Sequence, residues 1–473
     1  MKTRKSSVVS TCVFKARAGR ISRLLAPRLP SQRILLSFAA VILTGSFLLM
    51  LPGASTADRP GFLTALFTAT SATCVTGLVV VDTGSFWSPF GQAIILFLIQ
   101  IGGLGYMVIT TSMMSAFRNA RLRVRQTGDF RESLPAPLTG SPRSFALFIA
   151  RSVFLCEGVG AVILSVRFMH DMPVRRAVWT GLFTSVSAFC NAGLDVLGND
   201  MHNFIPYVGD VTVNIVVPLL IITGGLGFIV LDELFHKFSR IRVRRLSTHT
   251  RIVLATTAIL IAGGAAMLFA LEFTNPETIA AEPVRTRLFA SWFQSVTART
   301  AGFNTIPLGS MRSASLIVLI VLMFIGASPG GTGGGVKTTT VAVVLAFVWN
   351  ILVGSDQTRV GARGIRERTV HKAIVIFMLS LLVVLVGTFM LTLLDGERFS
   401  GLALLFDATS AFGTVGLSTG ITPALSAGSK STLIAIMLAG RVGVLATMLS
   451  LLAPTTAEHD RLIHLAETDI VVG

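Results

Sequence analysis

Long apolar runs alternate along this chain with short polar segments that are rich in arginine and lysine. Four uncharged runs approach or exceed the roughly 18 residues that a membrane-spanning helix requires; they cover 34–51, 90–117, 252–271 and 373–394. Four further runs have comparable length and are interrupted only by glycines, a proline or a few charged residues; they cover 144–166, 211–231, 315–353 and 431–452. The pattern therefore predicts eight membrane-spanning helices.

A shorter apolar stretch lies between the two spans of each pair. These stretches, at 62–71, 177–188, 288–298 and 402–412, are too short to cross the hydrocarbon core and are typical of re-entrant helices. Each is followed by a small, hydroxyl-rich segment that ends in a glycine, and the four glycines recur at intervals of 116, 109 and 114 residues: Gly77, Gly193, Gly302 and Gly416. Irregular backbone at membrane depth must face protein or water, so we expect the four loops to line one pore.

The predicted fold is an all-α integral membrane protein with eight transmembrane helices and four re-entrant pore helices, arranged as four pseudo-symmetric repeats around one pore. The repeats cover 34–117, 144–237, 252–349 and 373–453. They are joined by basic linkers at 118–143, 238–251 and 350–372 and flanked by tails at 1–33 and 454–473.

Composition supports a membrane location. Hydrophobic residues make up 52% of the chain, charged residues only 13%, and the formal net charge is +17. The segments 1–33, 118–143, 237–251 and 350–372 hold 26 of the 40 basic residues, all on one side of the eight-span topology. The positive-inside rule places that side, with both termini, in the cytoplasm of a multi-pass plasma-membrane protein.

The short basic linkers are explained by topology and anionic lipid, which excludes nucleic acid as a partner. The opposite segments hold 11 of the 23 acidic residues, which either concentrate cations or are ordinary solvated loops.

The glycine loops carry the candidate ion chemistry. Backbone carbonyls replace the hydration shell of an alkali cation without trapping it, and glycine allows backbone conformations that a Cβ disfavours. Re-entrant helices that end at these loops would also direct the negative ends of their dipoles toward a cation. The expected potassium ligands, and the only metal-binding groups that we predict, are the carbonyls of Thr76, Gly77, Ala192, Gly193, Ala301, Gly302, Val415 and Gly416.

A second glycine-rich segment interrupts the run at 315–353. Its backbone cannot sustain a helix, and it is expected to form a gate below the filter, the alternative being a packing kink. Arg441, inside the last span, is expected to form an electrostatic barrier at this gate or to be buried in a structural pair with Glu157 or Asp407. The predicted gate comprises Gly330, Gly331, Thr332, Gly333, Gly334, Gly335, Lys337 and Arg441.

The same segment superficially matches a phosphate-binding loop. That motif requires glycine immediately before lysine, but Val336 precedes Lys337, and membrane spans replace the expected strand and soluble helix. Nucleotide, if it acts, should therefore bind a separate subunit. The chain shows neither a catalytic constellation nor a metal-knuckle spacing, so we predict a non-enzyme without a cofactor. Cys74 and Cys190 share a position before their glycines, which favours loop packing over a metal pair.

Several of these motifs together resemble the Ktr/Trk/HKT superfamily of potassium transporters. The segments 71–78, 295–305 and 409–419 look like its first, third and fourth pore loops, and 99–105 and 326–336 are also similar. The resemblance extends from about residue 33 to 453 and is strongest to the pore-forming membrane subunit of the Ktr branch. It implies a homodimer with one pore in each chain, a cytoplasmic nucleotide-binding regulatory subunit that moves the gate, and surrounding membrane lipids.

The predicted function is potassium uptake across the cell membrane through a carbonyl-lined filter, gated by the intramembrane loop. Spacing alone fits sodium as well as potassium. The resemblance implies potassium, because in plant relatives a serine at the first filter glycine accompanies sodium selectivity, whereas Gly77 stands here. The alternative is a secondary transporter of another cation or a small solute, with broken helices at the membrane midplane.

Overall fold

The structure is a computed structural model that describes residues 30–56, 59–119, 142–198, 203–238, 246–355, 357–360, 363–444 and 447–448. The tail predicted at 454–473 lies outside these residues. So do most of the predicted tail at 1–33, most of the linker at 118–143, and residues 239–245 of the next linker. The orientation and partners of those segments therefore stay predictions.

The described helices recur in four sets of a long helix, a short helix and a second long or broken helix. The first set contains α2 (Pro30–Leu49), α3 (Phe62–Cys74), the single turn α4 (Thr83–Phe86) and α5 (Pro89–Asn119). The second contains α7 (Pro142–Phe168), α8 (Val174–Cys190), α9 (Val211–Leu226) and α10 (Phe228–Phe238). The third contains α11 (Thr248–Glu272), α12 (Val284–Thr297), α13 (Ser313–Phe324) and α14 (Thr338–Leu352), and the fourth α15 (Glu367–Asp395), α16 (Gly401–Gly413) and α17 (Ala427–Val442).

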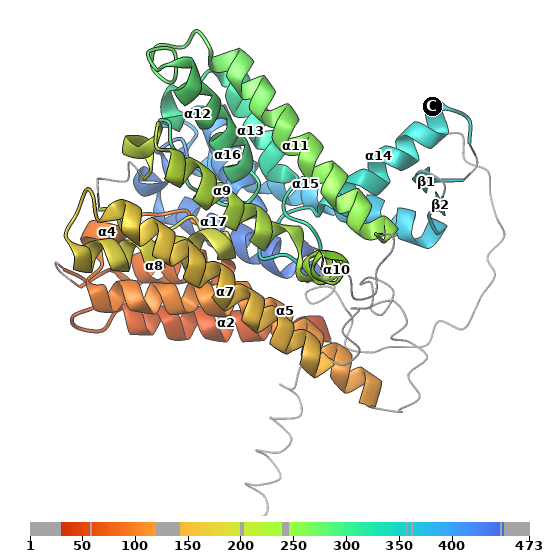
Figure 1. The fold of residues 1–473 in the computed structure, drawn as a ribbon, viewed down its shortest axis with the longest axis horizontal. Helices are drawn as coiled ribbons and strands as arrows, with labels where there is room; N and C mark the ends of the chain where they lie inside the picture. The colour runs from red at the N-terminus through yellow and green to blue at the C-terminus, as the bar shows by residue number, and fades with distance from the viewer. Residues whose placement is uncertain are drawn as a thin grey trace, which may run out of the picture.

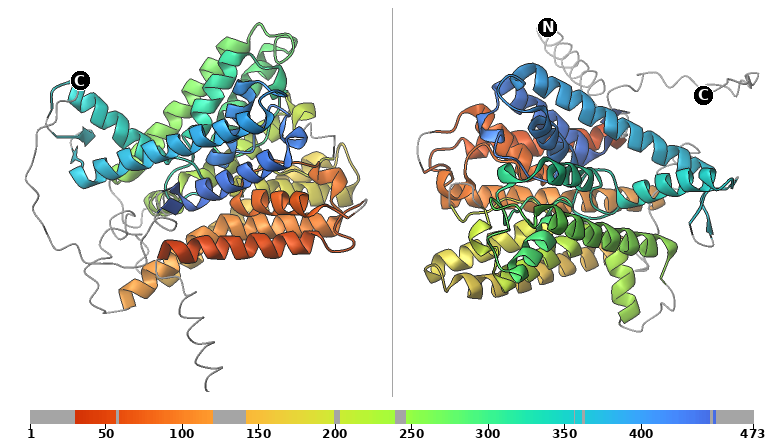
Figure 2. Two further views of the ribbon diagram at one scale, coloured as in Figure 1. Left: turned by 180° about the vertical axis from the view of Figure 1, so that it is seen from behind. Right: turned by 90° about the horizontal axis from the view of Figure 1, so that it is seen from above.

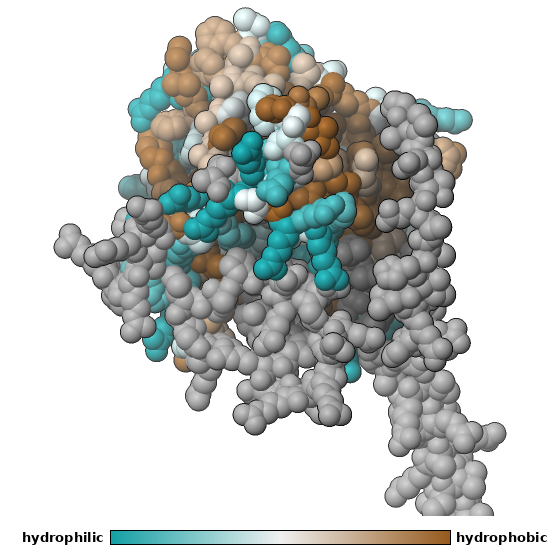
Figure 3. Space-filling view, turned by 90° about the vertical axis from the view of Figure 1, so that its right-hand side faces the viewer, coloured by the Kyte–Doolittle hydropathy of each residue, from teal (hydrophilic) through white to brown (hydrophobic). Residues whose placement is uncertain are grey.

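Short elements connect these helices. Single 3₁₀ turns cover Ile205–Tyr207, Leu308–Ser310 and Thr422–Ala424. Strands β1 (Arg359–Val360) and β2 (Arg363–Gly364) form a small antiparallel hairpin in which Arg359 faces Gly364. Figure 3 shows the end of the molecule that carries this hairpin, where hydrophilic side chains gather between hydrophobic surfaces. The exposed arginines there include Arg363, Arg366 and Arg368.

Local sequence explains where several helices begin. The Asp210 side chain accepts a hydrogen bond from the Val213 N–H and so caps α9. Ser400 and Ser426 cap α16 and α17 in the same way, which satisfies backbone donors that have no partner within a helix. Helix α15 starts at Glu367, six residues before the predicted repeat boundary, because its polar first turn continues beyond the apolar run.

Four described helices are long and apolar enough to cross a membrane: Gln32–Leu49, Ser144–Phe168, Thr248–Glu272 and Glu367–Asp395. A fifth candidate is the pair α9 and α10, which passes the same test as one span although its two parts are bent by 102°. Large apolar side chains cover the outside of α15, including Leu385, Phe389 and Leu393. An exposed apolar surface of this kind is matched to lipid rather than to water. The chain is therefore a multi-pass, all-α membrane protein.

The predicted interruption of the run at 315–353 is present in the structure, whereas a break in the run at 211–231 was not predicted. The predicted run 315–353 consists of two helices, α13 and α14, separated by an irregular segment that contains Pro329 and six glycines between 326 and 335. The run 211–231 ends as a straight helix at Gly227, whose φ of 93° is strongly disfavoured for residues with a Cβ. Glycine and proline thus decide where these helices end.

The four sets close into a circle around their short helices. Each short helix packs on the long helix before it, as in the pairs α2 with α3 and α15 with α16. The second long helix of each set also contacts the short helix of the next set, in the pairs α5 with α8, α9 with α12, α13 with α16 and α17 with α3. Figures 1 and 2 show the short helices among the longer ones, with the chain returning to its starting set.

Candidate functional site

The four loops after the short helices share one backbone conformation. In each, the residue two positions before the glycine is left-handed: Val75, Asn191, Thr300 and Thr414 have φ of 57°, 61°, 72° and 50°. The glycines themselves have φ of 92°, 65°, 86° and 94°, in the order Gly77, Gly193, Gly302 and Gly416. Side chains other than that of glycine rarely adopt this region, so a pair of unusual left-handed positions recurs in all four loops.

The four glycines lie against one another in a closed ring. A Cβ added to Gly77 would lie 2.6 Å from the carbonyl oxygen of Ala192, and one added to Gly193 would lie 2.5 Å from that of Ala301. The series continues in the same sense: a Cβ on Gly302 would meet the Val415 carbonyl, and one on Gly416 would lie 2.3 Å from the Thr76 carbonyl. All eight predicted ligand residues therefore come together, and only glycine leaves room between neighbouring loops.

Serine hydroxyls of the short helices hold three of the loops. Ser71 accepts a hydrogen bond from the Gly77 N–H at 3.0 Å, and Ser410 accepts one from the Gly416 N–H at 3.1 Å. Ser187 both accepts from the Leu194 N–H and donates to the Leu194 carbonyl. The third repeat has Val296 at this position, and its loop is held by a backbone hydrogen bond from the Ala301 N–H to the Thr297 carbonyl.

The fourth loop has an additional carboxylate behind it. Asp407 of α16 is fully buried and accepts hydrogen bonds from the Thr422 hydroxyl at 2.6 Å and the Ser418 hydroxyl at 3.2 Å. The corresponding positions in the first two repeats are Thr68 and Thr184. Asp407 thus positions the segment that follows Gly416, a role that the sequence alone did not suggest.

The irregular segment between α13 and α14 lies directly below the loops. A Cβ on Gly333 would lie 2.0 Å from the Thr300 hydroxyl, and one on Gly334 would lie 2.5 Å from the Thr414 hydroxyl. The Gly334 N–H donates to that Thr414 hydroxyl at 3.0 Å. Gly335 lies close to the backbone of Gly413, since an added Cβ would be 3.3 Å from its Cα. The segment therefore contacts the third and fourth loops from beneath.

The same segment is also bound to the break in the second set. The Thr332 N–H donates to the Gly224 carbonyl, the Ser328 N–H to the Gly225 carbonyl, and the Phe228 N–H to the Gly330 carbonyl. A Cβ on Gly331 would lie 2.7 Å from the Gly225 carbonyl. These hydrogen bonds attach the irregular segment to both α9 and α10.

Arg441 connects this segment to a further repeat. Its guanidinium donates to the Thr332 carbonyl within the segment and to the Gly102 carbonyl of α5. The two carboxylates considered as its partners are hydrogen-bonded to other groups: Glu157 by Gln100, and Asp407 by hydroxyls. Lys337 donates to the Gly333 carbonyl at 2.7 Å. The residues predicted for the gate thus lie together in one region that is held largely by hydrogen bonds.

Close-spaced glycines in the second long helices, at 102 and 105, 224 and 227, and 440 and 443, serve two purposes. Packing does account for Gly102, Gly224 and Gly440, because a Cβ on each would lie 1.9–2.1 Å from a carbonyl at the end of a short helix. Gly227 and Gly443 do more, since φ values of 93° and 96° end α9 and α17 there. The repeated Gly-x-x-Gly spacing was the available signal, but it does not distinguish contact from helix termination.

Asp195 lies two residues beyond Gly193, on the side of the loops away from the irregular segment. Burial raises the pKa of this carboxyl to about 7, the hydrogen bond from the Leu197 N–H opposes the rise, and the charge of Asp82 adds to it. The carboxyl is therefore neutral below about pH 7 and negative above it.

We expect Asp195 to make cation uptake depend on pH. Raising the pH from 6 to 8 ionises the carboxyl and concentrates cations, so uptake at subsaturating rubidium should rise about threefold. Asp195→Asn should remove this rise. Asp82→Asn, which deletes the neighbouring charge, should move its midpoint to lower pH in the same tracer measurement. If rubidium uptake depended on pH in the same way in the wild type, Asp195→Asn and Asp82→Asn, Asp195 would not be the titrating group.

Comparison with known proteins places this geometry in context. The model of the family described as "TrkH: Cation transport protein" matches residues 12–459. The chain is 38% identical over 421 residues to the Ktr system potassium uptake protein B of Bacillus subtilis, a match that covers 89% of this chain and 92% of the relative. It is 36% identical over 426 residues to the potassium/sodium uptake protein NtpJ of Enterococcus hirae, covering 89% and 93%.

A solved structure shares the fold. The crystal structure of the potassium transporter TrkH from Vibrio parahaemolyticus superimposes with a TM-score of 0.69, covering 89% of this chain and 84% of that chain at 18% sequence identity.

Proposed function

Because the chain belongs to the TrkH family of cation transport proteins, we propose that it takes up potassium through the ring formed by Gly77, Gly193, Gly302 and Gly416. The observation that carries this proposal is the cyclic contact of four similar turns, in which each glycine lies against a carbonyl of the following repeat. Carbonyls arranged in this way can replace the hydration shell of an alkali cation. The relatives named as potassium uptake proteins support potassium as the ion.

The proposal includes eight membrane spans and four re-entrant helices, with both termini in the cytoplasm. The four helix sets and their circular contacts support this arrangement. The ends of α3, α8 and α16 at the ring support it further, because the negative ends of their dipoles would stabilise a cation there. The loops would then open to the outside of the plasma membrane.

The irregular segment from Gly330 to Gly335 is the proposed gate. It lies under two of the four loops and is attached to α9, α10 and, through Arg441, to α5. An ion leaving the ring would have to displace it. A cytoplasmic nucleotide-binding subunit is the proposed regulator and a homodimer the proposed assembly. The name "Ktr system" of the Bacillus subtilis relative is consistent with more than one component.

A sodium-conducting function is the second candidate, because one relative is named a potassium/sodium uptake protein. The test is rubidium and sodium tracer uptake in a bacterium that lacks its own potassium uptake systems, with and without candidate cytoplasmic partners. The expected results are influx of the rubidium tracer and, separately, growth of the bacterium at low potassium. Uptake of an organic solute, with no cation flux, would identify a secondary transporter instead.

Gly77→Ser is expected to lower the preference for potassium over sodium about tenfold, because the added side chain would displace the Ala192 carbonyl from the ring. The ratio of rubidium to sodium influx measures this change. Gly158→Ser is the control, since no atom lies within 4 Å of a Cβ added to Gly158. An unchanged ratio in Gly77→Ser would remove Gly77 from the ion pathway.

A further inference from the structure

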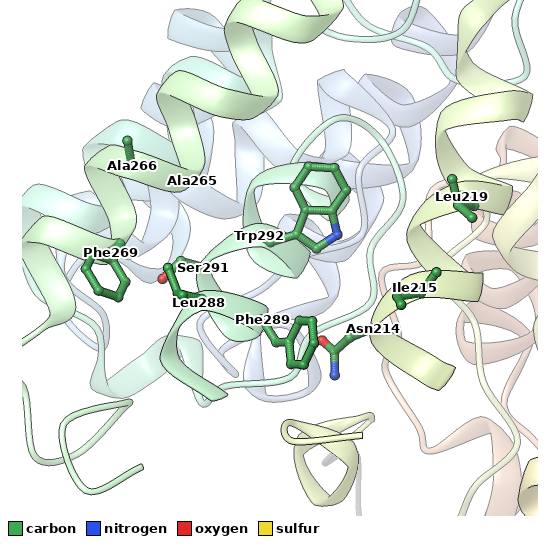
Figure 4. Close-up of a pocket in the computed structure, with 10 residues that line it drawn as sticks. All are labelled: Asn214, Ile215, Leu219, Ala265, Ala266, Phe269, Leu288, Phe289, Ser291 and Trp292. Atoms are coloured by element: carbon green, nitrogen blue, oxygen red, sulfur yellow. The ribbon is translucent and has the colours of Figure 1, made fainter. Parts of the chain in front are cut away.

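An apolar groove runs between α9, α11 and α12, on the outside of the helix circle (Figure 4). Its volume is about 640 Å³. Its walls are formed by Asn214, Ile215 and Leu219 of α9, Ala265, Ala266 and Phe269 of α11, and Leu288, Phe289, Ser291 and Trp292 of α12. The groove therefore lies at the seam between the second and third helix sets and touches the short helix of the third.

The position of the groove places it in one leaflet of the bilayer. Its residues belong to the first two-thirds of α9, the last third of α11 and the first two-thirds of α12, which all lie toward the end that carries the interhelical loop 273–283. Leu219 and Leu288 are each 53% exposed. Apolar side chains exposed at this depth contact acyl chains.

Two polar groups distinguish the groove from an ordinary apolar surface. Asn214 is fully buried; its Nδ2 donates to the carbonyls of Tyr207, Val208 and Asp210, and its Oδ1 has no partner among the described residues. Figure 4 shows this oxygen on the side of Phe289, and the indole nitrogen of Trp292 on the side of the groove that faces α9. A bound molecule with polar atoms near its apolar part can use these groups.

A positive charge stands one helical turn before the groove. Arg285 is exposed, and its guanidinium lies over the ring of Phe289, 5.5 Å from the centroid. This cation–π contact holds the guanidinium near the mouth of the groove while leaving its N–H groups open to solvent. Arginine binds phosphate oxygens with paired hydrogen bonds. The site thus combines an apolar channel with a cation at its entrance.

We propose that this groove binds an anionic phospholipid. One acyl chain lies between α9, α11 and α12, an ester carbonyl accepts from the Trp292 N–H, and the phosphate pairs with Arg285. The assignment to the outer leaflet rests on the orientation proposed above; the site itself does not. Because α12 leads into the loop of Ala301 and Gly302, the lipid would support the short helix that positions one quarter of the ring.

Fluorescence quenching by brominated lipid tests the site. The full chain is reconstituted in phosphatidylcholine vesicles containing a minor share of brominated phosphatidylglycerol, and the contribution of Trp292 is obtained by difference from Trp292→Phe. The anionic lipid is expected to quench Trp292 at a mole fraction about fivefold below that of brominated phosphatidylcholine. Arg285→Gln should abolish this preference, and Ala266→Leu, which fills the groove, should weaken quenching by either lipid.

Matched variants control for general effects. Arg59→Gln removes another exposed arginine outside the groove, and Ala262→Leu enlarges an exposed residue one turn away on α11; both should retain the wild-type preference. Equal quenching by the two headgroups, or loss of quenching because a second copy of the chain covers Trp292, would overturn the proposal. Quenching does not depend on ion flux, so this outcome and a failure of potassium uptake are distinguishable.

Discussion

Arg441→Ala is expected to raise rubidium influx about 10- to 100-fold in cells that lack the cytoplasmic regulator. The guanidinium donates to the carbonyls of Thr332 and Gly102, and hydrogen bonds from a charged donor contribute about 1.5–3 kcal/mol each. Loss of this bridge frees the irregular segment from α5 and removes a positive charge from the pathway. Since each 1.4 kcal/mol is a factor of ten, release worth about 2 kcal/mol gives an increase in this range.

Arg441→Lys separates the charge from the bridge. A lysine keeps the electrostatic barrier but lacks the planar fork that reaches both carbonyls, so an increase similar to that of Arg441→Ala would identify the bridge as the restraint. Arg398→Ala controls for removal of an arginine, because the side chain of Arg398 is exposed and lies just after the C-terminal end of α15. Flux at the wild-type level in both Arg441 variants, at equal amounts of protein in the membrane, would contradict the gate.

Gly416→Ala is expected to reduce rubidium uptake about 30-fold or more, because two penalties combine at this position. The φ of 94° is unfavourable for alanine by about 1–2 kcal/mol. The new methyl group would also lie 2.3 Å from the Thr76 carbonyl and 2.8 Å from the Gly77 Cα, so the ring would have to open. Tracer uptake at saturating rubidium, normalised to protein in the membrane, measures the loss.

Gly420→Ala provides a matched control in the same loop. Gly420 has a φ of 96°, so alanine there has the same backbone strain, but no atom lies within 4 Å of the added Cβ. We expect this variant to transport nearly as well as the wild type. If Gly420→Ala were as damaging as Gly416→Ala, strain in the loop, and not contact within the ring, would explain both results.

The elements around the ring could be predicted from the sequence because short apolar runs and glycines determine them locally. The short helices α3, α8, α12 and α16 follow from short apolar runs, and the glycines that end their loops follow from spacing. The left-handed residues two positions earlier were not predicted. Val75 and Thr414 are β-branched and disfavour this conformation, so tertiary contacts impose it.

The contacts of the proposed gate could not be predicted from the sequence. Arg441 was recognised as an expensive charge within the membrane, and carboxylates were its natural partners by charge. Its guanidinium instead donates to two carbonyls: that of Thr332, which lies in the irregular segment outside any helix, and that of Gly102 in α5. Because every residue has a backbone carbonyl, the sequence does not show which carbonyl will accept; that depends on where a helix is interrupted.

A ring of four has no terminal member. Each glycine contacts the loop of the following repeat, from Gly77 through Gly193 and Gly302 to Gly416 and back. A displaced loop therefore pushes on one neighbour and withdraws support from the other, whereas the repeat on the opposite side is reached only through these two. Second mutations that restore a damaged ring should accordingly arise in adjacent repeats, and the last repeat counts as adjacent to the first although they are far apart in the sequence.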